Sequence, residues 1–337
     1  MYFEKLTGFT EENHKQVQQN IIVKGGIMTS LVNGKSYGCG NLEVPSLAEL
    51  RERSKVLYSD NAQLQLTEVI GDVQDFYNDE ANAGAMFQVA SQFNLLEMLG
   101  PNRTPEEGVD IYEYDATQGP ASAIACAAAT IYRNYFVNVN GEIGQTSDNQ
   151  IDCLQDIGYA LENEKLLLWQ MRNGYALANE EGLRNINRKL SAYSAAQFDN
   201  LKSKLRIGVQ WDTEVTLNDR KDKVNQVFCS ALPVAYSDVN SDLWEPFARL
   251  VLEATYEATF WAALINYERP DGNSKGNNKL FLTLVGGGAF GNRMEWITDA
   301  IGKSLKLFRN TPLDVRIVSY GSSRHEVREL IELYINN

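Results

Sequence analysis

The stretch that most constrains the fold is LFLTLVGGGAFGN at 280–292, where an apolar run leads directly into four glycines. The run from Leu280 to Val285 predicts a strand that is covered on both faces. The glycines that follow leave the backbone free to turn, with no Cβ to keep a ligand at a distance. Because a helical pattern comes next at 294–308, the arrangement is typical of loops that offer N–H groups to a phosphate. The alternative is a tight turn that binds nothing.

The composition narrows the class of protein. The chain has 337 residues and a formal net charge of −13, which argues against binding a nucleic acid through its phosphates. No run approaches the roughly 18 consecutive apolar residues of a membrane helix, and the first residues lack the pattern of a signal peptide. The four scattered cysteines and two histidines lack the spacing of metal ligands. We therefore expect no metal site and a cytoplasmic or other reducing compartment.

Strand and helix patterns alternate from residue 64 onward, which predicts an α/β fold with a mixed, mostly parallel sheet covered by helices on both faces. Residues 1–65 are predicted to form an N-terminal addition, and residues 66–337 the main domain. Within that domain, residues 151–205 are predicted to be an inserted helical segment. In the N-terminal addition, Ser46 and Glu49 have the spacing of a capping box that opens a helix.

Five short segments, in their order along the chain, resemble the motifs of the macrodomain superfamily, whose members bind ADP-ribose and in some cases hydrolyse its bonds. They are IGDV at 70–73, VASQFN at 89–94, TQGPASA at 117–123, GGGAFGN at 286–292 and IVSYG at 317–321. The long segment between Asn94 and Gln118 and the inserted helices resemble the larger poly(ADP-ribose) glycohydrolase-like branch, including MavL-type ADP-ribosylhydrolases. The triple glycine leading to Gln-Glu-Glu of that branch is absent, because no glutamate follows Gln118.

The resemblance implies a three-layer, macrodomain-like fold with an ADP-ribose site at the strand ends. Asp72 would accept from the adenine amino group, Asn94 would contact the distal ribose, and Tyr320 would stack near the adenine. The diphosphate would be held by Gln118, Gly119, Gly287, Gly288, Ala289, Phe290, Gly291 and Asn292. From the residues alone, Asp72 could instead close a turn, and Tyr320 could be an ordinary core or surface aromatic. The pair at 118–119 could likewise serve only as a packed helix start.

Hydrolysis of an ADP-ribosyl bond passes through an oxocarbenium-like centre and needs a carboxyl group to protonate the leaving group or activate water. The acidic loop between the second and third motifs would carry it. Asp115 is the first candidate, because it lies three residues before Gln118 and just ahead of a helix start. Glu113, Asp110 and Glu97 are the alternatives. Asp115 could equally be a helix cap, and the other three could be solvated loop residues.

The sequence therefore predicts an ADP-ribosyl hydrolase that needs no cofactor and acts on an ADP-ribosylated protein or a related substrate, with no membrane or nucleic-acid partner. Two alternatives stay open. One is a module that binds ADP-ribose without cleaving it. The other is a Rossmann-type NAD oxidoreductase, because Gly286, Gly288 and Gly291 satisfy GxGxxG. A dinucleotide-binding fold of this kind should have an acidic residue at the end of the next strand. In the predicted next strand, Asp314 lies near the beginning instead.

Overall fold

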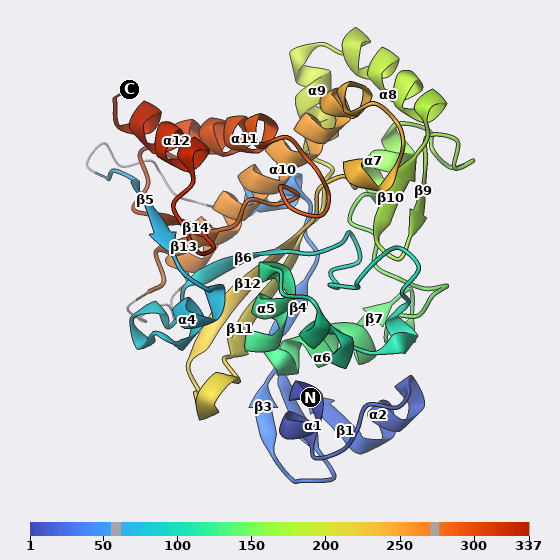
Figure 1. Ribbon diagram of the computed structural model, residues 1–337, viewed down its shortest axis with the longest axis vertical. Helices are drawn as coiled ribbons and strands as arrows, with labels where there is room; N and C mark the ends of the chain where they lie inside the picture. The colour runs from blue at the N-terminus through green and yellow to red at the C-terminus, as the bar shows by residue number, and fades with distance from the viewer. Residues whose placement is uncertain (55–61, 270–275, 337) are drawn as a thin grey trace.

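The structure is a computed structural model that describes residues 1–54, 62–269 and 276–336 (Figure 1). Within these residues, a sheet of seven strands forms the centre, in the order β4-β11-β12-β6-β13-β14-β5. The strands are β4 (Asn41–Glu43), β5 (Gln65–Ile70), β6 (Met86–Ala90), β11 (Gly208–Glu214), β12 (Lys223–Cys229), β13 (Lys279–Leu282) and β14 (Asp314–Ser319). The run from β12 to β5 pairs in parallel, whereas β11 pairs antiparallel with both β12 and β4. The predicted mixed, mostly parallel sheet is confirmed.

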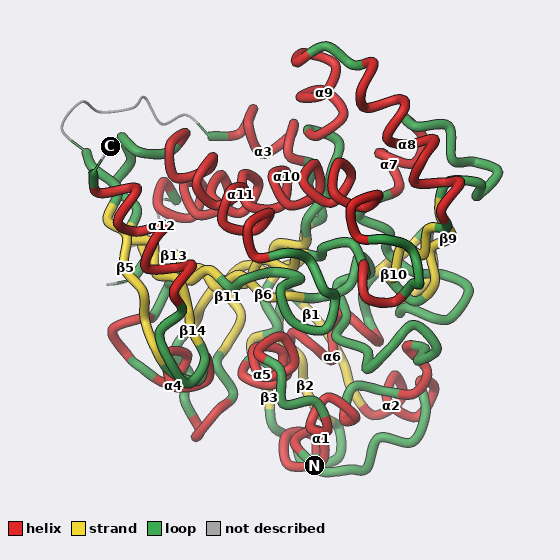
Figure 2. Tube along the Cα trace, turned by 45° about the horizontal axis from the view of Figure 1, so that its top comes forward, coloured by secondary structure: helices red, strands yellow, loops and turns green. Residues whose placement is uncertain are grey.

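Helices cover both faces of this sheet, which gives the three layers that the resemblance implies (Figure 2). One layer contains α3 (Leu47–Arg53), α10 (Ser241–Glu268), α11 (Met294–Leu307) and α12 (His325–Ile335); the other contains α4 (Val73–Asn78), α5 (Gln118–Ala125) and α6 (Ala127–Tyr135). The long helix α10 packs against the sheet and against α3 and α11. Its buried residues include Phe247, Leu250 and Tyr256, as expected of a helix covered on several sides.

Part of the N-terminal region belongs to the main sheet. Its first half forms a small unit that packs against α6, made of α1 (Tyr2–Thr7), α2 (His14–Asn20), β1 (Ile21–Lys24), β2 (Ile27–Ser30) and β3 (Ser36–Gly38). Its second half supplies the sheet strand β4 and the helix α3, which begins with the predicted capping box of Ser46 and Glu49. The described part of the predicted addition, residues 1–54, thus supplies both a separate unit and elements of the main domain.

The predicted helical insertion at 151–205 contains helices and a β-hairpin. The helices are α7 (Gln155–Ala160), α8 (Glu180–Ala192) and α9 (Ala195–Lys202), and the hairpin strands are β9 (Trp169–Arg172) and β10 (Tyr175–Ala178). Asn173 and Gly174 form the turn between the strands, with φ values of 47° and 78°. Because this left-handed pair is what a two-residue hairpin turn requires, the all-helical prediction is wrong here.

The helical segment that begins at Gln118 is divided into α5 and α6. Cys126 lies between them with φ −121° and ψ 58°. Thr216, in the loop after β11, causes the break: its N–H donates to Ala125 O, and its Oγ1 accepts from Ala127 N–H. A second small hairpin, β7 (Asn138–Val139) and β8 (Glu142–Ile143), follows α6.

Candidate active site

A cleft with a volume of about 360 Å³ opens at the carboxyl edge of the parallel strands, between the loops that follow β6 and β13. These two strands are neighbours in the sheet. The helix after β6, α5, covers one face of the sheet, whereas the helix after β13, α11, covers the other (Figure 1). The connections after β6 and after β13 therefore lead to opposite faces of the sheet. Open α/β sheets bind ligands at the edge where two neighbouring connections separate in this way.

The glycine-rich loop forms one wall of the cleft. β13 ends at Leu282, three residues before the predicted strand end, and a turn begins at Val285. Gly286 has a φ of 78°, and a Cβ at this position would lie 2.4 Å from the Cβ of Ala231. Both the backbone conformation and the close approach therefore require glycine here.

Residues 288–290 of this wall offer free backbone N–H groups. Within the described residues, the N–H groups of Gly288, Ala289 and Phe290 have no acceptor from the protein, whereas the N–H of Gly287 donates to Leu284 O at 3.0 Å. All four residues line the cleft. Successive free N–H groups just ahead of a helix are suited to bind a diphosphate.

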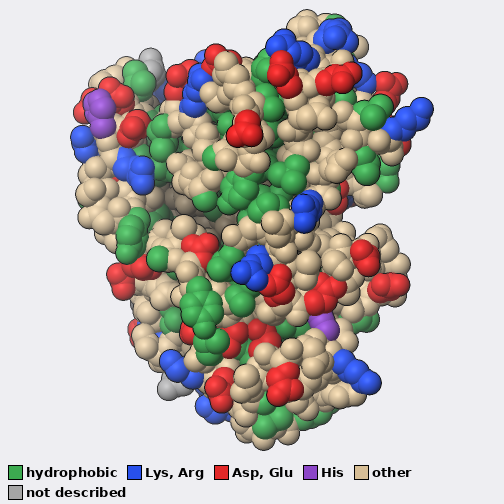
Figure 3. Space-filling view, turned by 45° about the vertical axis from the view of Figure 1, so that its right-hand side comes forward, with side chains coloured by type: hydrophobic (Ala, Val, Ile, Leu, Met, Phe, Trp, Pro, Cys, Tyr) green, Lys and Arg blue, Asp and Glu red, His purple; other side chains and the backbone are tan. Residues whose placement is uncertain are grey.

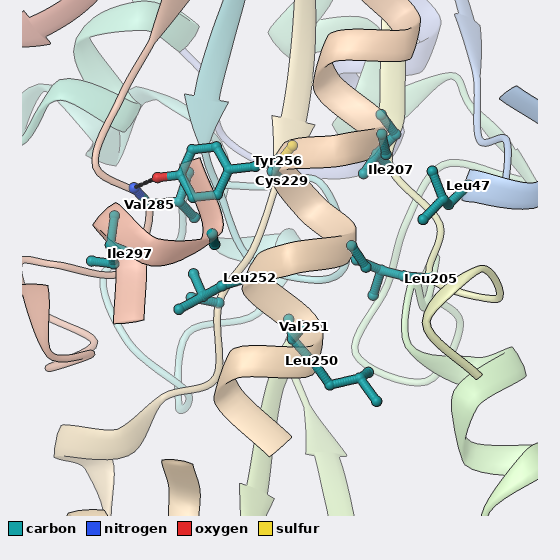
Figure 4. Packing of buried hydrophobic residues seen from close by; sticks show 14 of the residues in the cluster. Leu47, Leu205, Ile207, Cys229, Leu250, Val251, Leu252, Tyr256, Val285 and Ile297 are labelled. Atoms are coloured by element: carbon teal, nitrogen blue, oxygen red, sulfur yellow. Dashed lines mark hydrogen bonds between the residues drawn. The ribbon is translucent and has the colours of Figure 1, made fainter. Parts of the chain in front are cut away.

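Two buried side chains hold the base of this wall beyond the end of the strand. The hydroxyl of Tyr256, on α10, donates to Thr283 O at 2.8 Å and accepts from Val285 N–H at 3.0 Å (Figure 4). The Oε1 of Gln88, on β6, accepts from Thr283 N–H at 3.2 Å. These hydrogen bonds replace the hydrogen bonds between strands, so the loop is fixed although the strand pairing has ended.

Gly291 and Asn292 shape the loop but do not line the cleft. The N–H of Gly291 donates to Gly288 O at 3.0 Å. Asn292 is 4% exposed, and its Nδ2 donates to Leu232 O at 2.8 Å. The predicted contact of these two residues with the diphosphate is therefore replaced by a structural role.

The start of α5 contributes to the same cleft. Gln118 and Gly119 both line it, and their N–H groups have no protein acceptor in the part of the chain that the structure describes. The Oε1 of Gln118 accepts from Val73 N–H at 2.7 Å, which ties α5 to α4. The structure thus brings these two predicted residues and the glycine loop to one cavity.

Asp72 and Asn94 do not line the cleft. Asp72 caps α4, because its Oδ1 accepts from Gln74 N–H at 2.9 Å; this is the turn-closing alternative. Asn94 is fully buried, its Nδ2 donates to Gln150 Oε1 at 2.8 Å, and its Oδ1 accepts from Leu96 N–H at 3.2 Å. Since both ends of its side chain are bound within the protein, this arrangement does not offer Asn94 to a ribose.

Tyr320 and Arg324 line the cleft beside the end of β14. The side chain of Tyr320 is 58% exposed, so its ring is open to a ligand. Arg324 lies at the start of α12, and its N–H donates to Glu68 Oε1 at 2.9 Å. No acidic partner binds its guanidinium among the described residues, which leaves it available to an anion. The sequence analysis missed Arg324, although its place just after the last strand was a usable signal.

An aromatic cluster of Tyr175, Tyr236 and Phe290 also lines the cleft. Its ring centroids lie 5.1 to 5.6 Å apart. Phe290 packs on both tyrosines as well as lining the cavity. Tyr175 was missed because it begins β10, within the segment predicted to be helical.

Glu97 lies at the floor of the cleft. Its residue exposure is 2%, yet it lines the cavity, and neither carboxyl oxygen has a hydrogen-bond partner. The nearest cation is the guanidinium of Arg133, whose Nη2 lies 3.7 Å from Oε2. Burial raises the pKa of Glu97 to about 8, although the charge of Arg133 opposes this shift. A buried carboxyl that has no hydrogen-bond partner and lines a cleft is a candidate for acid–base catalysis.

The turn that carries Glu97 is tightly held and partly strained. Leu95 has a φ of 65°, a left-handed conformation that side chains of its kind rarely adopt. The amide of Gln92 accepts from Met98 N–H at 2.8 Å and donates to Met98 O at 3.2 Å. The Nε of Arg133 donates to Leu95 O at 3.0 Å. Strain maintained by surrounding contacts is a feature of functional turns.

Arg133 is fully buried and lies over the ring of Phe228, with 3.6 Å between Cζ and the ring centroid. Its Nη1 has no hydrogen-bond partner. Burial lowers the pKa of its guanidinium from the ordinary 12.5, but arginine stays charged near neutral pH. Glu97 therefore lies beside a permanent cation in a dry environment, an arrangement that the sequence analysis missed.

Of the four predicted carboxylates, Glu97 and Asp115 line the cleft. Asp115 is partly exposed, and its Oδ1 accepts from Thr117 N–H at 2.8 Å, just ahead of α5. Asp110 instead accepts from the N–H of Phe3, and Glu113 lies 3.9 Å from the N-terminal amine. The structure does not bring the predicted catalytic residues Asp110 and Glu113 to the cleft, because both contact the N-terminal segment. Burial favours Glu97 over Asp115.

Other kinds of site have little support in the described residues. Among them, no group of three or more His, Cys, Asp and Glu side chains could hold a metal ion. No described helix is both long and apolar enough to cross a bilayer. On the face drawn in Figure 3, Lys and Arg side chains are interspersed with Asp and Glu.

Comparisons with known proteins yield likenesses of structure alone. No protein-family model matches the chain, and no curated protein matches it. The structure is similar to poly(ADP-ribose) glycohydrolase from Deinococcus radiodurans in complex with ADP-ribose, with 9% identity, a TM-score of 0.47, and 88% of this chain and 94% of that chain covered. It is also similar to poly(ADP-ribose) glycohydrolase from Thermomonospora curvata, with 10% identity, a TM-score of 0.45 and 95% of each chain covered.

Proposed function

We propose that the chain is an ADP-ribosyl hydrolase that binds ADP-ribose in the cleft and cleaves its bond to a modified protein or a related substrate. The observation that carries the proposal is the buried carboxyl of Glu97 in a cavity that is also lined by free backbone N–H groups. Burying a polar group without a partner is costly, so such a group calls for an explanation such as catalysis. A carboxyl and a diphosphate-binding loop in one cleft are what hydrolysis of an ADP-ribosyl bond requires.

The protonation state of Glu97 suits a general acid. With a pKa of about 8, its carboxyl is mostly protonated at neutral pH. It can donate this proton to the leaving atom as the glycosidic bond breaks. Water then adds to the oxocarbenium-like anomeric carbon, and the proton that water loses returns to the Glu97 carboxylate. Each turnover restores the acid, so water is the only reactant besides the ADP-ribosylated substrate and the reaction needs no cofactor.

The diphosphate is assigned to backbone donors on both sides of the cleft. The N–H groups of Gly288, Ala289 and Phe290 are free on one side, and those of Gln118 and Gly119 on the other. Neutral donors suit a protein with a net charge of −13, in which clustered cations are scarce.

The adenine contacts stay a prediction. The open ring of Tyr320 and the guanidinium of Arg324 are the groups that the cleft offers at its rim. Asp72 adjoins Val73, whose N–H is bound by the side chain of Gln118. Asp72 is therefore near the cleft, although it does not line it.

The hydride-transfer alternative has less support. β14 ends at Ser319 without an acidic residue, and Asp314 forms an ion pair with Arg316 at the beginning of the strand. Gly291, the last glycine of the fingerprint, does not line the cleft. The fingerprint thus lacks the carboxylate that a dinucleotide ribose requires. A module that binds without cleaving stays the main competitor, since no glutamate follows Gln118.

The proposal is tested by titrating the protein with ADP-ribose, AMP and NAD in a calorimeter, and then by measuring ADP-ribose release from a modified protein. We expect ADP-ribose to bind more tightly than AMP. The variant Glu97→Gln should bind ADP-ribose as the wild type does, but lose on the order of 10²- to 10⁴-fold in turnover. Glu113→Gln, which alters a carboxylate outside the cleft, is the matched control. Binding without release by the wild type would favour the module, and ADP-ribose binding no better than AMP would refute both.

A further inference from the structure

The residues on either side of Glu97 are buried in a core that the N-terminal unit shares. Leu96 is 0% exposed and Met98 is 2% exposed, and both belong to one apolar cluster with residues of α1. Phe3, on α1, is fully buried in the same cluster. The backbone that carries Glu97 thus packs against the beginning of the chain.

Glu11, in the link between α1 and α2, binds the turn that faces this unit. Its carboxylate accepts from the N–H of Val109 at 2.9 Å, from the N–H of Asp110 at 2.7 Å, and from the hydroxyl of Tyr135 at 2.7 Å. Gly108 permits the approach, because a Cβ there would lie 2.4 Å from Oε2 of Glu11. Hydrogen bonds to a carboxylate are stronger than neutral ones, so Glu11 fixes the turn firmly.

Two further hydrogen bonds join α1 to the same turn. The hydroxyl of Tyr2 donates to Val109 O at 2.9 Å. The Oδ1 of Asp110 accepts from Phe3 N–H at 3.3 Å. The turn is therefore held from both ends of the segment that runs from Tyr2 to Glu11.

Tyr112 links this turn to the active site. It lies two residues after Asp110 and is fully buried. Its hydroxyl oxygen accepts from Glu97 N–H at 3.1 Å. A continuous path therefore runs from Glu11, through the turn, to the backbone of the residue that carries the buried carboxyl. Neither Glu11 nor Tyr112 lines the cleft.

We propose that the N-terminal segment is a brace of the active site, in which Glu11 and Tyr112 are positioning residues that hold the Glu97 backbone, and hence its carboxyl, at the floor of the cleft. The catalytic part of this inference rests on the proposed function, because it takes Glu97 as the acid. The brace itself is a property of the fold. Through this brace, residues 2–11 would contribute to the reaction by holding Glu97 in position.

Two substitutions with matched controls test the brace. Tyr112→Phe removes the one oxygen that binds the Glu97 N–H, and Tyr114→Phe, at a side chain that is 70% exposed, is its control. Glu11→Gln removes the charge that holds the turn, and Glu12→Gln, at the exposed neighbouring residue, is its control. If Glu11→Gln fails to fold, Tyr112→Phe still tests the proposal, because it removes a single hydroxyl group.

The first readout is independent of activity. Amide hydrogen exchange is measured by mass spectrometry on a peptide that covers residues 94–99. We expect exchange on the order of tenfold faster in Tyr112→Phe and in Glu11→Gln, because a hydrogen bond that protects this turn is lost or weakened. The two controls should exchange at the wild-type rate.

The second readout is the pH dependence of kcat. A looser turn admits water around Glu97, so we expect Tyr112→Phe to lower kcat by about tenfold, with KM within roughly twofold, and to move the fall in kcat to lower pH. A merely structural role would reduce the amount of folded enzyme without moving that pH.

The two readouts separate the two proposals. If the wild-type protein releases no ADP-ribose, the proposed function fails, while the exchange measurement still decides whether the brace exists. Wild-type exchange at residues 94–99 in both Tyr112→Phe and Glu11→Gln would overturn the brace. Faster exchange with an unchanged pH dependence of kcat would overturn its role in positioning the acid.

Discussion

The two walls of the cleft are built in different ways. The glycine wall at 283–290 presents backbone N–H groups, and its shape depends on Gly286 and on the anchoring side chains Tyr256 and Gln88. The second wall presents the carboxyl of Glu97 at the floor of the cleft, and the position of this carboxyl depends on residues far apart in the sequence. The glycine wall is a local arrangement that is held by a few side chains from elsewhere. The wall that carries Glu97, in contrast, forms only when the whole chain has folded.

This difference determines which substitutions abolish the function of each wall. A backbone site loses its function when the loop changes shape, because the N–H groups themselves survive any substitution except proline. A side-chain site loses its function when one carboxyl is removed or its burial changes. Substitutions can therefore disturb either wall separately.

The largest expected effect is on the carboxyl wall. The pKa of Glu97 is raised by burial from 4.5 to about 8, so the folded state holds the proton more tightly than the unfolded state. Wild-type stability should fall as pH rises from about 4.5 to about 8, because the group is charged in the unfolded chain but resists charging when buried. Glu97→Gln, which cannot ionise, should gain on the order of a few kcal/mol over the wild type across this range.

Urea unfolding at pH 5 and at pH 8.5 measures this gap. Glu113→Gln, at a partly exposed carboxylate near the N-terminus, should unfold in parallel with the wild type at both values. Parallel curves for Glu97→Gln and the wild type would mean that Glu97 is not buried as a neutral acid.

The next effect is on the glycine wall. Gly286→Ala places a Cβ in a left-handed conformation and 2.4 Å from the Cβ of Ala231, so we expect it to lower the free energy of unfolding by about 1–3 kcal/mol and to weaken ADP-ribose binding. Gly288→Ala is the matched control for stability, because a Cβ there meets nothing within 4 Å. Equal unfolding free energies of the two variants would contradict the described loop.

The smallest effect comes from the anchor beneath this wall. Tyr256→Phe removes the hydroxyl that bridges Thr283 O and Val285 N–H, which keep only their hydrogen bond to each other. We expect a loss of roughly 1–2 kcal/mol in the free energy of unfolding and a few-fold weaker affinity for ADP-ribose. Tyr267→Phe, on the same helix and 40% exposed, should behave as the wild type does. If both variants match the wild type, the loop is held by something other than Tyr256.

The same contrast accounts for what the sequence could predict. The strand, the glycine loop and the helix after it depend on local patterns, and they were located correctly except that β13 ends at Leu282 rather than Val285. The helix start at Gln118 was placed for the same reason. Local patterns thus position the backbone donors that the cleft uses.

The choice among the carboxylates depended on burial, which no local pattern reports. Asp115 is the best placed of the four in the sequence. However, Arg133, thirty-six residues after Glu97 in the chain, and Tyr112 create the dry setting of Glu97. Asp110 and Glu113 belong to contacts with the N-terminus. Two local signals were overlooked: the Asn-Gly turn before Tyr175, and the place of Arg324 just after the last strand.

The most direct test of the central claim, that Glu97 is the acid of an ADP-ribosyl hydrolase, is the pH dependence of kcat for ADP-ribose release. A general acid must be protonated, so kcat should be constant at pH values well below 8 and fall as pH rises through about 8. Asp115→Asn should retain this dependence, since Asp115 caps a turn at the mouth of the cleft. A fall in kcat near pH 8 that survives in Glu97→Gln, or disappears in Asp115→Asn, would contradict the account.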